Sequence, residues 1–389
     1  MGNDAPIGGR HLDERVYWIW LQRALGVGGT RIPAVLRAFQ TAKAFYEAGA
    51  SAWEGLGILT QREKELLHTG SLQEAGLLLN RCAALGQTVL TPETPGYPER
   101  LRAIYHPPCV LYVQGKLPDM DRCLSIAIVG SRTASHAALH TAGEISGALA
   151  RNGVVVVSGG AHGVDHAVHE AALSAGGVTV SVLPCGIDYP YLPEYAELRE
   201  MIAASGALVS EYPPGTGVQK WNFRTRNRLL SGLSSGVLIA EAAKRSGTMI
   251  TARYALEQNR DVFVIPANVG PESEGSNGLL RSGAKAVLAA EDVLDEYAGR
   301  DYEQVLPQEA PAQMARPAAQ DAKALFSKEF SADAETVYRV LGKTPLTIGE
   351  VAAATGLSAQ RLFVALTELE IEQKIQSLAG RRYVRIETA

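Results

Sequence analysis

The sequence VVVVSGGAHGVD occupies residues 154–165 and joins an apolar run to a glycine-rich turn. Four consecutive valines without polar alternation are typical of a strand that is buried on both faces of a parallel sheet. Glycines directly after such a strand let another segment or a ligand approach the backbone closely, because they carry no side chain. This stretch therefore predicts one strand and one ligand-side loop of an α/β domain.

The same pattern recurs on both sides of this stretch. Short β-branched runs separated by helix-like segments favour an α/β fold with a doubly wound, Rossmann-like parallel sheet over residues 87–298. In such sheets ligands bind beyond the carboxyl ends of the strands, where the loops here are rich in Gly, Ser and Arg. We expect the binding site at that edge. The other predicted strands are Ile126–Val129, Val178–Leu183, Ala207–Val209, Val237–Ala240 and Val262–Pro266.

Residues 12–85, ahead of the α/β domain, carry apolar side chains at helical spacing. Gly26-Val27-Gly28 joins two of the expected helices, in the manner of SAM-like or helix-hairpin-helix modules that offer backbone N–H groups to a phosphate. Residues 56–59 look like a second, weaker copy. The alternative is a small helical packing module whose glycines only turn the chain. The sequence leaves both interpretations open.

A domain boundary is expected after the α/β domain. Residues 299–327 are rich in Ala, Pro and Gln and predict a linker. Residues 328–389 hold three helix-like segments and a terminal strand pair, in the order of a winged helix. The third segment carries Arg361 but also Glu368 and Glu370, the wrong charge for reading a major groove. Recognition of a DNA sequence is therefore not indicated.

Composition limits where a polyanion could bind. The 389 residues have a formal net charge of -4 and a pI near 6.1, so any nucleic-acid site must be a local basic patch. Four cysteines without a C-x-x-C pair indicate neither a disulfide framework nor a zinc site. Residues 1–10 lack the apolar core of a signal peptide, and no apolar run reaches the length of a membrane span. We expect a cytoplasmic protein that does not enter a membrane.

The run KWNFRTRNR, which begins at Lys220, holds four cations and two aromatic rings. Cations suit phosphates and ring faces suit bases, so this composition favours single-stranded nucleic acid. We expect Lys220 and one or two arginines to contact phosphates, Phe223 to stack on a base, and Asn227 to shape the loop. The alternative is a solvated basic helix start, with Phe223 in the core and Glu211 and Glu241 as ion-pair partners.

Two loops at the same edge supply further candidates. The turn Gly130-Ser131-Arg132 follows a strand, so its backbone N–H groups and the Arg132 guanidinium can hold a phosphate. An ordinary strand-to-helix turn with a surface arginine is the alternative. In the loop that contains Gly159 we expect Asp165 to accept hydrogen bonds from loop amides, with a catalytic role as the sharper alternative.

Three histidines near that loop raise the question of a metal site. His162, His166 and His169 are spaced as on one helix. Metal-binding histidines generally come with a carboxylate or thiolate as a third ligand, whereas these begin on a glycine-rich loop and do not form a His-Glu-x-x-His pattern. We expect no metal, and we place His162 near a phosphate.

Further motifs run through the α/β domain. They include Tyr97-Pro98, Pro107-Pro108, Ser210-Glu211, Pro213-Pro214-Gly215, Phe223-x-x-Arg226-Asn227-Arg228, Ser246-Gly247-Thr248, Thr251-Ala252 and Gly283-Ala284. In this order, and with the two loops above, they resemble the DNA-processing protein A (DprA/Smf) family. The resemblance covers the whole α/β domain. The flanking regions are similar to the helical and winged-helix modules that many members of the family carry.

The resemblance implies a protein, not an enzyme, that binds single-stranded DNA without sequence preference. It also implies a homodimer that loads a RecA-type recombinase onto strands covered by single-strand-binding protein during natural transformation. No cofactor, metal or catalytic residue follows from it. The family's DNA pocket maps to Ser131, Arg132, Lys220 and Phe223, and Arg224 stands where proline is frequent. The expected DNA-binding residues are Ser131, Arg132, Gly159, His162, Lys220, Phe223, Arg224, Arg226, Asn227 and Arg228.

An enzyme is the alternative from another class. The α/β domain is similar in outline to the nucleotide phosphoribohydrolases of the lysine-decarboxylase-like fold. Those proteins require a Pro-Gly-Gly-x-Gly-Thr-x-x-Glu loop. Ser246-Gly247-Thr248 is present here, but no Pro-Gly-Gly precedes it and no glutamate follows in register. The sequence therefore favours DNA binding.

Overall fold

The computed structural model describes residues 13–305, 331–342, 346–371, 374–378 and 382–385. By contacts the chain divides into two compact units, residues 1–310 and 311–389. Most of the predicted linker lies outside the described residues. The start of the predicted linker packs on the first unit, because Glu303 forms a β-bridge with Cys123.

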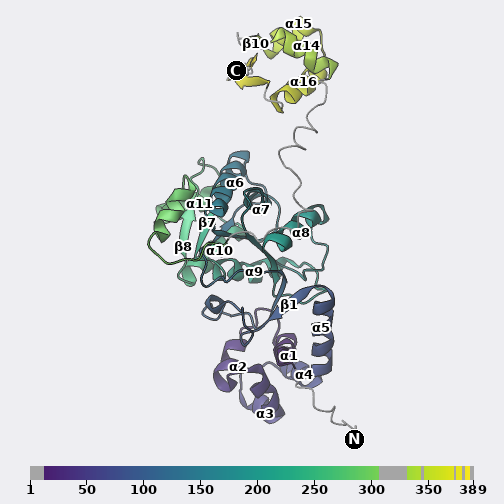
Figure 1. The fold of residues 1–389 in the computed structure, drawn as a ribbon, viewed down its shortest axis with the longest axis vertical. Helices are drawn as coiled ribbons and strands as arrows, with labels where there is room; N and C mark the ends of the chain where they lie inside the picture. The colour runs from purple at the N-terminus through teal and green to yellow at the C-terminus, as the bar shows by residue number, and fades with distance from the viewer. Residues whose placement is uncertain (1–12, 306–330, 343–345, 372–373, 379–381, 386–389) are drawn as a thin grey trace. The chain divides into compact units, whose positions relative to one another are not determined.

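Within the described residues, a nine-stranded sheet forms the centre of the first unit, in the order β1-β2-β6-β5-β4-β3-β7-β8-β9 (Figure 1). Neighbouring strands from β6 to β9 are parallel, which confirms the predicted doubly wound sheet. The antiparallel strands β1 and β2 extend one edge and were not predicted. The bounds are Gln87–Leu90 (β1), Leu111–Gly115 (β2), Ser125–Val129 (β3), Val155–Ser158 (β4), Thr179–Leu183 (β5), Ala207–Ser210 (β6), Gly236–Ile239 (β7), Asp261–Val264 (β8) and Lys285–Ala286 (β9).

Helices cover both faces of this sheet. They span His136–Arg151 (α6), Val164–Ser174 (α7), Ala196–Ser205 (α8), Lys220–Gly232 (α9), Gly247–Glu257 (α10), Glu274–Arg281 (α11) and Ala290–Leu294 (α12), with short 3-10 turns at Glu99–Leu101, Pro193–Tyr195 and Asp295–Tyr297. In β3, Ala127 and Val129 share a core with α9 and α10. Ile126 and Ile128 share the opposite core with α6 and α7. Because both faces are covered, the central strands need no polar residues.

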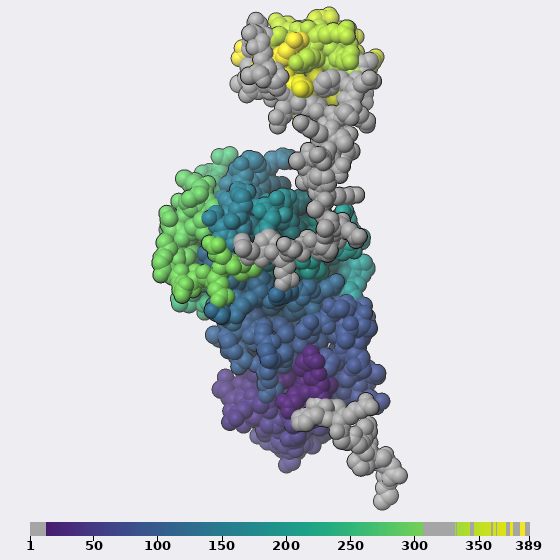
Figure 2. Space-filling view, viewed as in Figure 1, coloured from purple at the N-terminus to yellow at the C-terminus, as the bar shows by residue number. Residues whose placement is uncertain are grey.

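Five helices precede the sheet, at Arg15–Leu25 (α1), Ile32–Phe39 (α2), Ala42–Gly55 (α3), Gln61–Thr69 (α4) and Leu72–Ala84 (α5). The core of this helical module continues without interruption to Tyr112 and Leu208 of the sheet. Buried Gln22 on α1 joins the two parts, since its Nε2 donates to the Glu211 carbonyl at 3.1 Å and its Oε1 accepts from the Tyr112 hydroxyl. In the space-filling view the purple module abuts the blue segment that carries β1 and β2 (Figure 2).

The second unit has the predicted order of a winged helix. Its helices span Ala332–Val340 (α14), Ile348–Thr355 (α15) and Ala359–Ile371 (α16), and its strands span Leu346–Thr347 (β10), Ile375–Leu378 (β11) and Arg382–Arg385 (β12). The strands form a small antiparallel sheet in the order β10-β12-β11. Val337, Leu366 and Ile375 belong to its separate core. Arg361 forms an ion pair with Asp333 at 2.6 Å.

Two general expectations concern membranes and thiols. Among the described residues, no helix is long and apolar enough to cross a bilayer. The four cysteines are buried and unpaired. Burial raises the pKa of Cys82 and of Cys123 to about 11 and that of Cys185 to about 12, so these thiols are poor nucleophiles at neutral pH.

Candidate nucleic-acid interface

A cavity of about 400 Å³ opens at the carboxyl end of β3, beside its neighbour β7. The chain leaves β3 toward α6 on one face of the sheet and leaves β7 toward α10 on the other. Strands whose connections diverge in this way leave a crevice between their ends, which is where open α/β sheets bind ligands. The cavity therefore lies at the edge that the sequence indicated.

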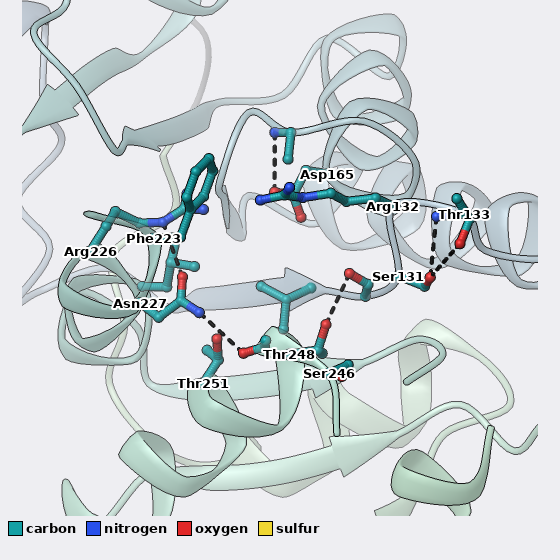
Figure 3. A pocket seen from close by; sticks show the side chains of 15 residues that line it. Ser131, Arg132, Thr133, Asp165, Phe223, Arg226, Asn227, Ser246, Thr248 and Thr251 are labelled. Atoms are coloured by element: carbon teal, nitrogen blue, oxygen red, sulfur yellow. Dashed lines mark hydrogen bonds between the residues drawn. The ribbon is translucent and has the colours of Figure 1, made fainter. Parts of the chain in front are cut away.

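Arg132 and Phe223 face each other across part of this cavity. The guanidinium carbon of Arg132 lies 4.4 Å from the centroid of the Phe223 ring, within the range of a cation–π contact. Phe223 is half-buried and makes an edge contact with the Tyr191 ring, 6.1 Å between centroids. Figure 3 shows the two side chains approaching from opposite sides. Phe223 thus lines the cavity and is not a core residue.

The turn at residues 130–132 lines the cavity with its side chains, and one of its backbone N–H groups is already hydrogen-bonded elsewhere. Gly130 packs so closely on α7 that an added Cβ would lie 2.5 Å from Cγ2 of Val164. The Ser131 N–H donates to the Glu241 carbonyl at 2.9 Å. That amide is therefore not available to a phosphate, contrary to the expectation from the sequence. The Ser131 hydroxyl and the Arg132 side chain remain on the cavity wall.

Arg226 and Asn227 form hydrogen bonds that hold that wall in shape, a role that the sequence analysis gave to Asn227. Buried Arg226 donates from Nη1 to the Gly159 carbonyl at 2.7 Å and from Nε to Oδ1 of Asn227 at 3.1 Å. Asn227 in turn donates to the Gly247 carbonyl at 3.2 Å. Gly159 permits this approach because a Cβ there would lie 2.1 Å from Nη1. Gly159 is thus a position where close packing leaves no room for a side chain.

Asp165 lies at the start of α7 and lines the cavity. It accepts a hydrogen bond from the Ala161 N–H at 3.2 Å, which is the loop-shaping role expected from the sequence. Burial raises the pKa of this carboxyl, while the charge of Arg226 opposes the shift. Burial likewise lowers the pKa of the Arg226 guanidinium.

Arg228 has a different role from the one expected. Its side chain is 3% exposed, and its Nη2 lies 2.8 Å from the carboxylate of Glu211, which is 2% exposed. The same carboxylate accepts the Gly28 N–H of the hairpin at 3.1 Å. Arg228 is therefore a structural cation, because the hairpin and Glu211 remove it from solvent. The bond to Gly28 also favours the packing interpretation of the hairpin.

His162 and Glu241 also differ from the expectations. His162 places Nδ1 2.9 Å from the Tyr195 hydroxyl and Nε2 3.5 Å from Glu194, so it contacts the 3-10 turn and not the cavity. Glu241 does not pair with the basic run. It accepts from the N–H and hydroxyl of Ser135, at 3.0 and 2.7 Å, and so stabilises the start of α6. Among the described residues, no cluster could hold a metal ion.

Lys220 and Arg224 lie on the exposed surface of α9, outside the cavity. The basic run is helical from Lys220 onward. In the part of the chain that the structure describes, neither residue has an ion-pair partner, and the same holds for Arg132. These three cations are thus available to an anionic ligand.

The start of α10 was missed as part of the site. Ser246, Thr248 and Thr251 line the cavity with hydroxyl groups (Figure 3). Thr248 Oγ1 donates to the Gly130 carbonyl at 3.0 Å and joins the two walls. The sequence does contain a cluster of small hydroxyl residues after a buried strand. This cluster indicates a binding site only when the strand order is known, because it reaches the cavity through the pairing of β7 with β3.

These features define a Rossmann-like α/β protein with a ligand cavity at the strand switch point and a C-terminal winged-helix unit. Residues 88–298 match the model of the family DNA recombination-mediator protein A, and residues 310–381 match the DprA winged helix domain. The chain belongs to the DNA recombination-mediator protein A family.

Individual relatives agree with this assignment. DNA processing protein DprA of Bacillus subtilis is 38% identical over 212 residues, which cover 54% of this chain and 71% of that protein. The structure of DprA from Streptococcus pneumoniae superposes with a TM-score of 0.65 at 31% identity, covering 72% of this chain and 97% of that one. A structure that describes the single-stranded DNA binding mode of DNA processing protein A from Helicobacter pylori has a TM-score of 0.51 at 32% identity, covering 56% and 97%.

Proposed function

We propose that this protein binds single-stranded DNA, without sequence preference, at the cavity beside β3 and β7. The contact between Arg132 and Phe223 carries the proposal, because it places an unpaired cation and an aromatic face at one cavity. Single-strand binders combine these two groups so that a phosphate and a base are held together. The relationship to the Helicobacter pylori protein supports the same ligand.

The distribution of charge supports a local site. The whole chain carries a formal net charge of -4, yet Arg132, Lys220 and Arg224 are exposed and unpaired around the start of α9 within the described residues. Binding to phosphates depends on the charges nearest to them, not on the total. In this proposal the three cations hold phosphates and Phe223 stacks on a base. Arg226, Asn227 and Asp165 keep the wall rigid, and Arg228 has no part in ligand contact.

We further place the protein in the cytoplasm as a homodimer that loads a RecA-type recombinase onto single strands, including strands covered by single-strand-binding protein, during natural transformation. Membership of the recombination-mediator family supports this role. The buried free cysteines are compatible with a reducing compartment. The proposal has no enzymatic step and no cofactor.

We further propose that the chain divides into four parts: the helical module (12–85), the α/β domain (87–298), the linker (299–327) and the winged-helix domain (328–389).

Binding is tested with the full-length protein by titration against labelled single-stranded and duplex DNA of equal length over a range of salt concentrations. We expect tighter binding to the single strand, equal affinity for unrelated sequences, and a linear fall of log affinity with log salt. Preference for duplex DNA, or no binding at low salt, would contradict the proposed ligand.

The recombinase role requires a separate assay. RecA filament formation on DNA covered by single-strand-binding protein should accelerate when the full-length protein is added. An Arg132→Ala variant should lose most of this acceleration while remaining folded. If the parent protein and Arg132→Ala accelerate filament formation equally, the effect on the recombinase does not depend on the proposed DNA site.

A further inference from the structure

Trp221 is an exposed aromatic residue that the site described above does not use. Its side chain is 51% exposed, while Trp18, Trp20 and Trp53 are at most 7% exposed. Two contacts fix the orientation of the indole ring. Its Nε1 donates to Oε1 of Gln219 at 2.6 Å, and its ring makes an edge contact with the Tyr212 ring at 6.1 Å. About half of a large, positioned side chain is therefore open to solvent.

The helical geometry of α9 relates this ring to the cavity. At about 100° per residue, the order around the exposed side of α9 is Phe223, Lys220, Arg224 and Trp221. The opposite side of this turn is closed, because Asn222 is buried and donates to the Pro184 carbonyl at 2.7 Å. Two unpaired cations thus lie between two aromatic rings on one continuous surface of the helix.

We propose that Trp221 is a second base-stacking platform, and that one single strand crosses the start of α9 from Phe223 to Trp221 with its phosphates on Lys220 and Arg224. This inference rests on the proposed function and extends its site. The alternation of aromatic faces with cations matches the alternation of bases and phosphates along a strand. A helix with its side chains is about 10–12 Å across, so the two rings receive different bases.

The Phe223 and Trp221 ends of this path have different surroundings. Phe223 belongs to the cavity wall with Arg226 and Asn227. Trp221 lies on the side of α9 that meets the hairpin, where an added Cβ at Gly28 would lie 2.7 Å from Cγ2 of Thr225. A strand on this path therefore leaves the cavity toward the helical module. The platform makes the bound segment longer than the cavity alone would hold.

Tryptophan fluorescence of the full-length protein tests the platform directly, since Trp221 is the only exposed tryptophan of the four. Oligothymidylates from about 4 to about 16 nucleotides cover the usual site sizes of single-strand binders. We expect binding to quench the fluorescence and to protect it from acrylamide, with the longer oligonucleotides giving the full effect. Trp221→Phe should retain a stacking surface and bind nearly as well as the parent protein.

Trp221→Ala should bind the long oligonucleotides at least about fivefold more weakly, as expected for a lost base stack. Leu77→Ala, which removes another exposed apolar side chain on α5, is the matched control and should bind normally. Unchanged affinity of Trp221→Ala, or fluorescence that does not respond to saturating DNA, overturns the platform. If Phe223→Ala still impairs binding in that case, only this inference fails. If the parent protein binds no single strand, the proposed function fails.

Discussion

The guanidinium carbon of Arg132 lies 4.4 Å from the centroid of the Phe223 ring, although the two residues are far apart in the chain. Arg132 follows β3, and Phe223 lies on the first turns of α9. Parallel strand order brings them together at one edge of the sheet. A guanidinium group and an aromatic ring from distant segments are thus in contact at one cavity.

Arg132→Ala should weaken binding of single-stranded DNA and reduce the slope of log affinity against log salt by about one unit, because one phosphate contact is lost. The measurement is a titration at four or more salt concentrations. Arg132→Lys is the matched control, since it keeps the charge and should keep most of the slope. A slope that stays the same in Arg132→Ala would remove this residue from the phosphate contacts.

Phe223→Ala should cost about 1–3 kcal/mol of binding free energy, because a stacked base loses its platform. Phe223→Tyr keeps the ring and should bind like the parent. Denaturant unfolding of the same variants checks that the loss concerns binding and not folding. Normal binding by a folded Phe223→Ala variant would reassign the ring to packing.

Arg228→Ala should lower the free energy of unfolding by about 3–5 kcal/mol, since it leaves the Glu211 carboxylate buried without its cation. Arg224→Ala, on the exposed side of the same helix, should change it by less than about 0.5 kcal/mol. Denaturant unfolding measures both. Similar stabilities for the two variants would contradict the buried ion pair.

Gly159→Ala should destabilise the protein by about 1–3 kcal/mol, because its Cβ would lie 2.1 Å from Nη1 of Arg226 and 2.5 Å from Oδ2 of Asp165. Gly278→Ala in α11 is the control, since among the described residues nothing beyond its chain neighbours and its own helix backbone lies within 4 Å of the new Cβ. There the change should be neutral or slightly stabilising. Thermal unfolding of the two variants measures the difference. Equal changes in stability would show that the close contact of Gly159 with Arg226 and Asp165 does not matter.

Acid should destabilise the protein through His169. Thr179 Oγ1 donates to the Val156 carbonyl at 2.8 Å, so His169 Nδ1–H is the donor to Thr179 Oγ1, at 2.7 Å. The acquired proton must then go to Nε2, which is buried and has no hydrogen-bond partner among the described residues. Burial accordingly lowers the pKa of His169 to about 3.

Since the unfolded chain binds the proton near pH 6.5, the stabilising effect of neutral His169 is complete above that pH. It is lost as the pH falls toward about 3, with a limiting slope of about 1.4 kcal/mol per pH unit. Unfolding of the parent and of His169→Gln, compared between pH 7 and pH 4, measures the contribution. An equal loss of stability in the two proteins would exclude His169 as its source.

Much of the fold could be predicted because its signals are local. The valine run at 154–157 and the other central runs lack polar residues since both faces of the sheet are covered by helices. The antiparallel strands β1 and β2 escaped prediction because nothing in their short sequences specifies the edge that they join. The continuous core between the helical module and the sheet could not be predicted either, because it depends on contacts between distant segments, such as that of Gln22 with Glu211.

For the site, the sequence by itself determined which chemical groups are present: a run of cations and rings at 220–228, and glycine loops at the carboxyl edge of the sheet. Only the tertiary structure decided which of the cations are available. Arg224 and Arg228 are one turn apart on α9, yet one faces solvent and the other is buried against Glu211 and the Gly28 hairpin. The physical reason is that burial and ion pairing come from segments distant in the chain, whereas residue type and helical periodicity are local properties.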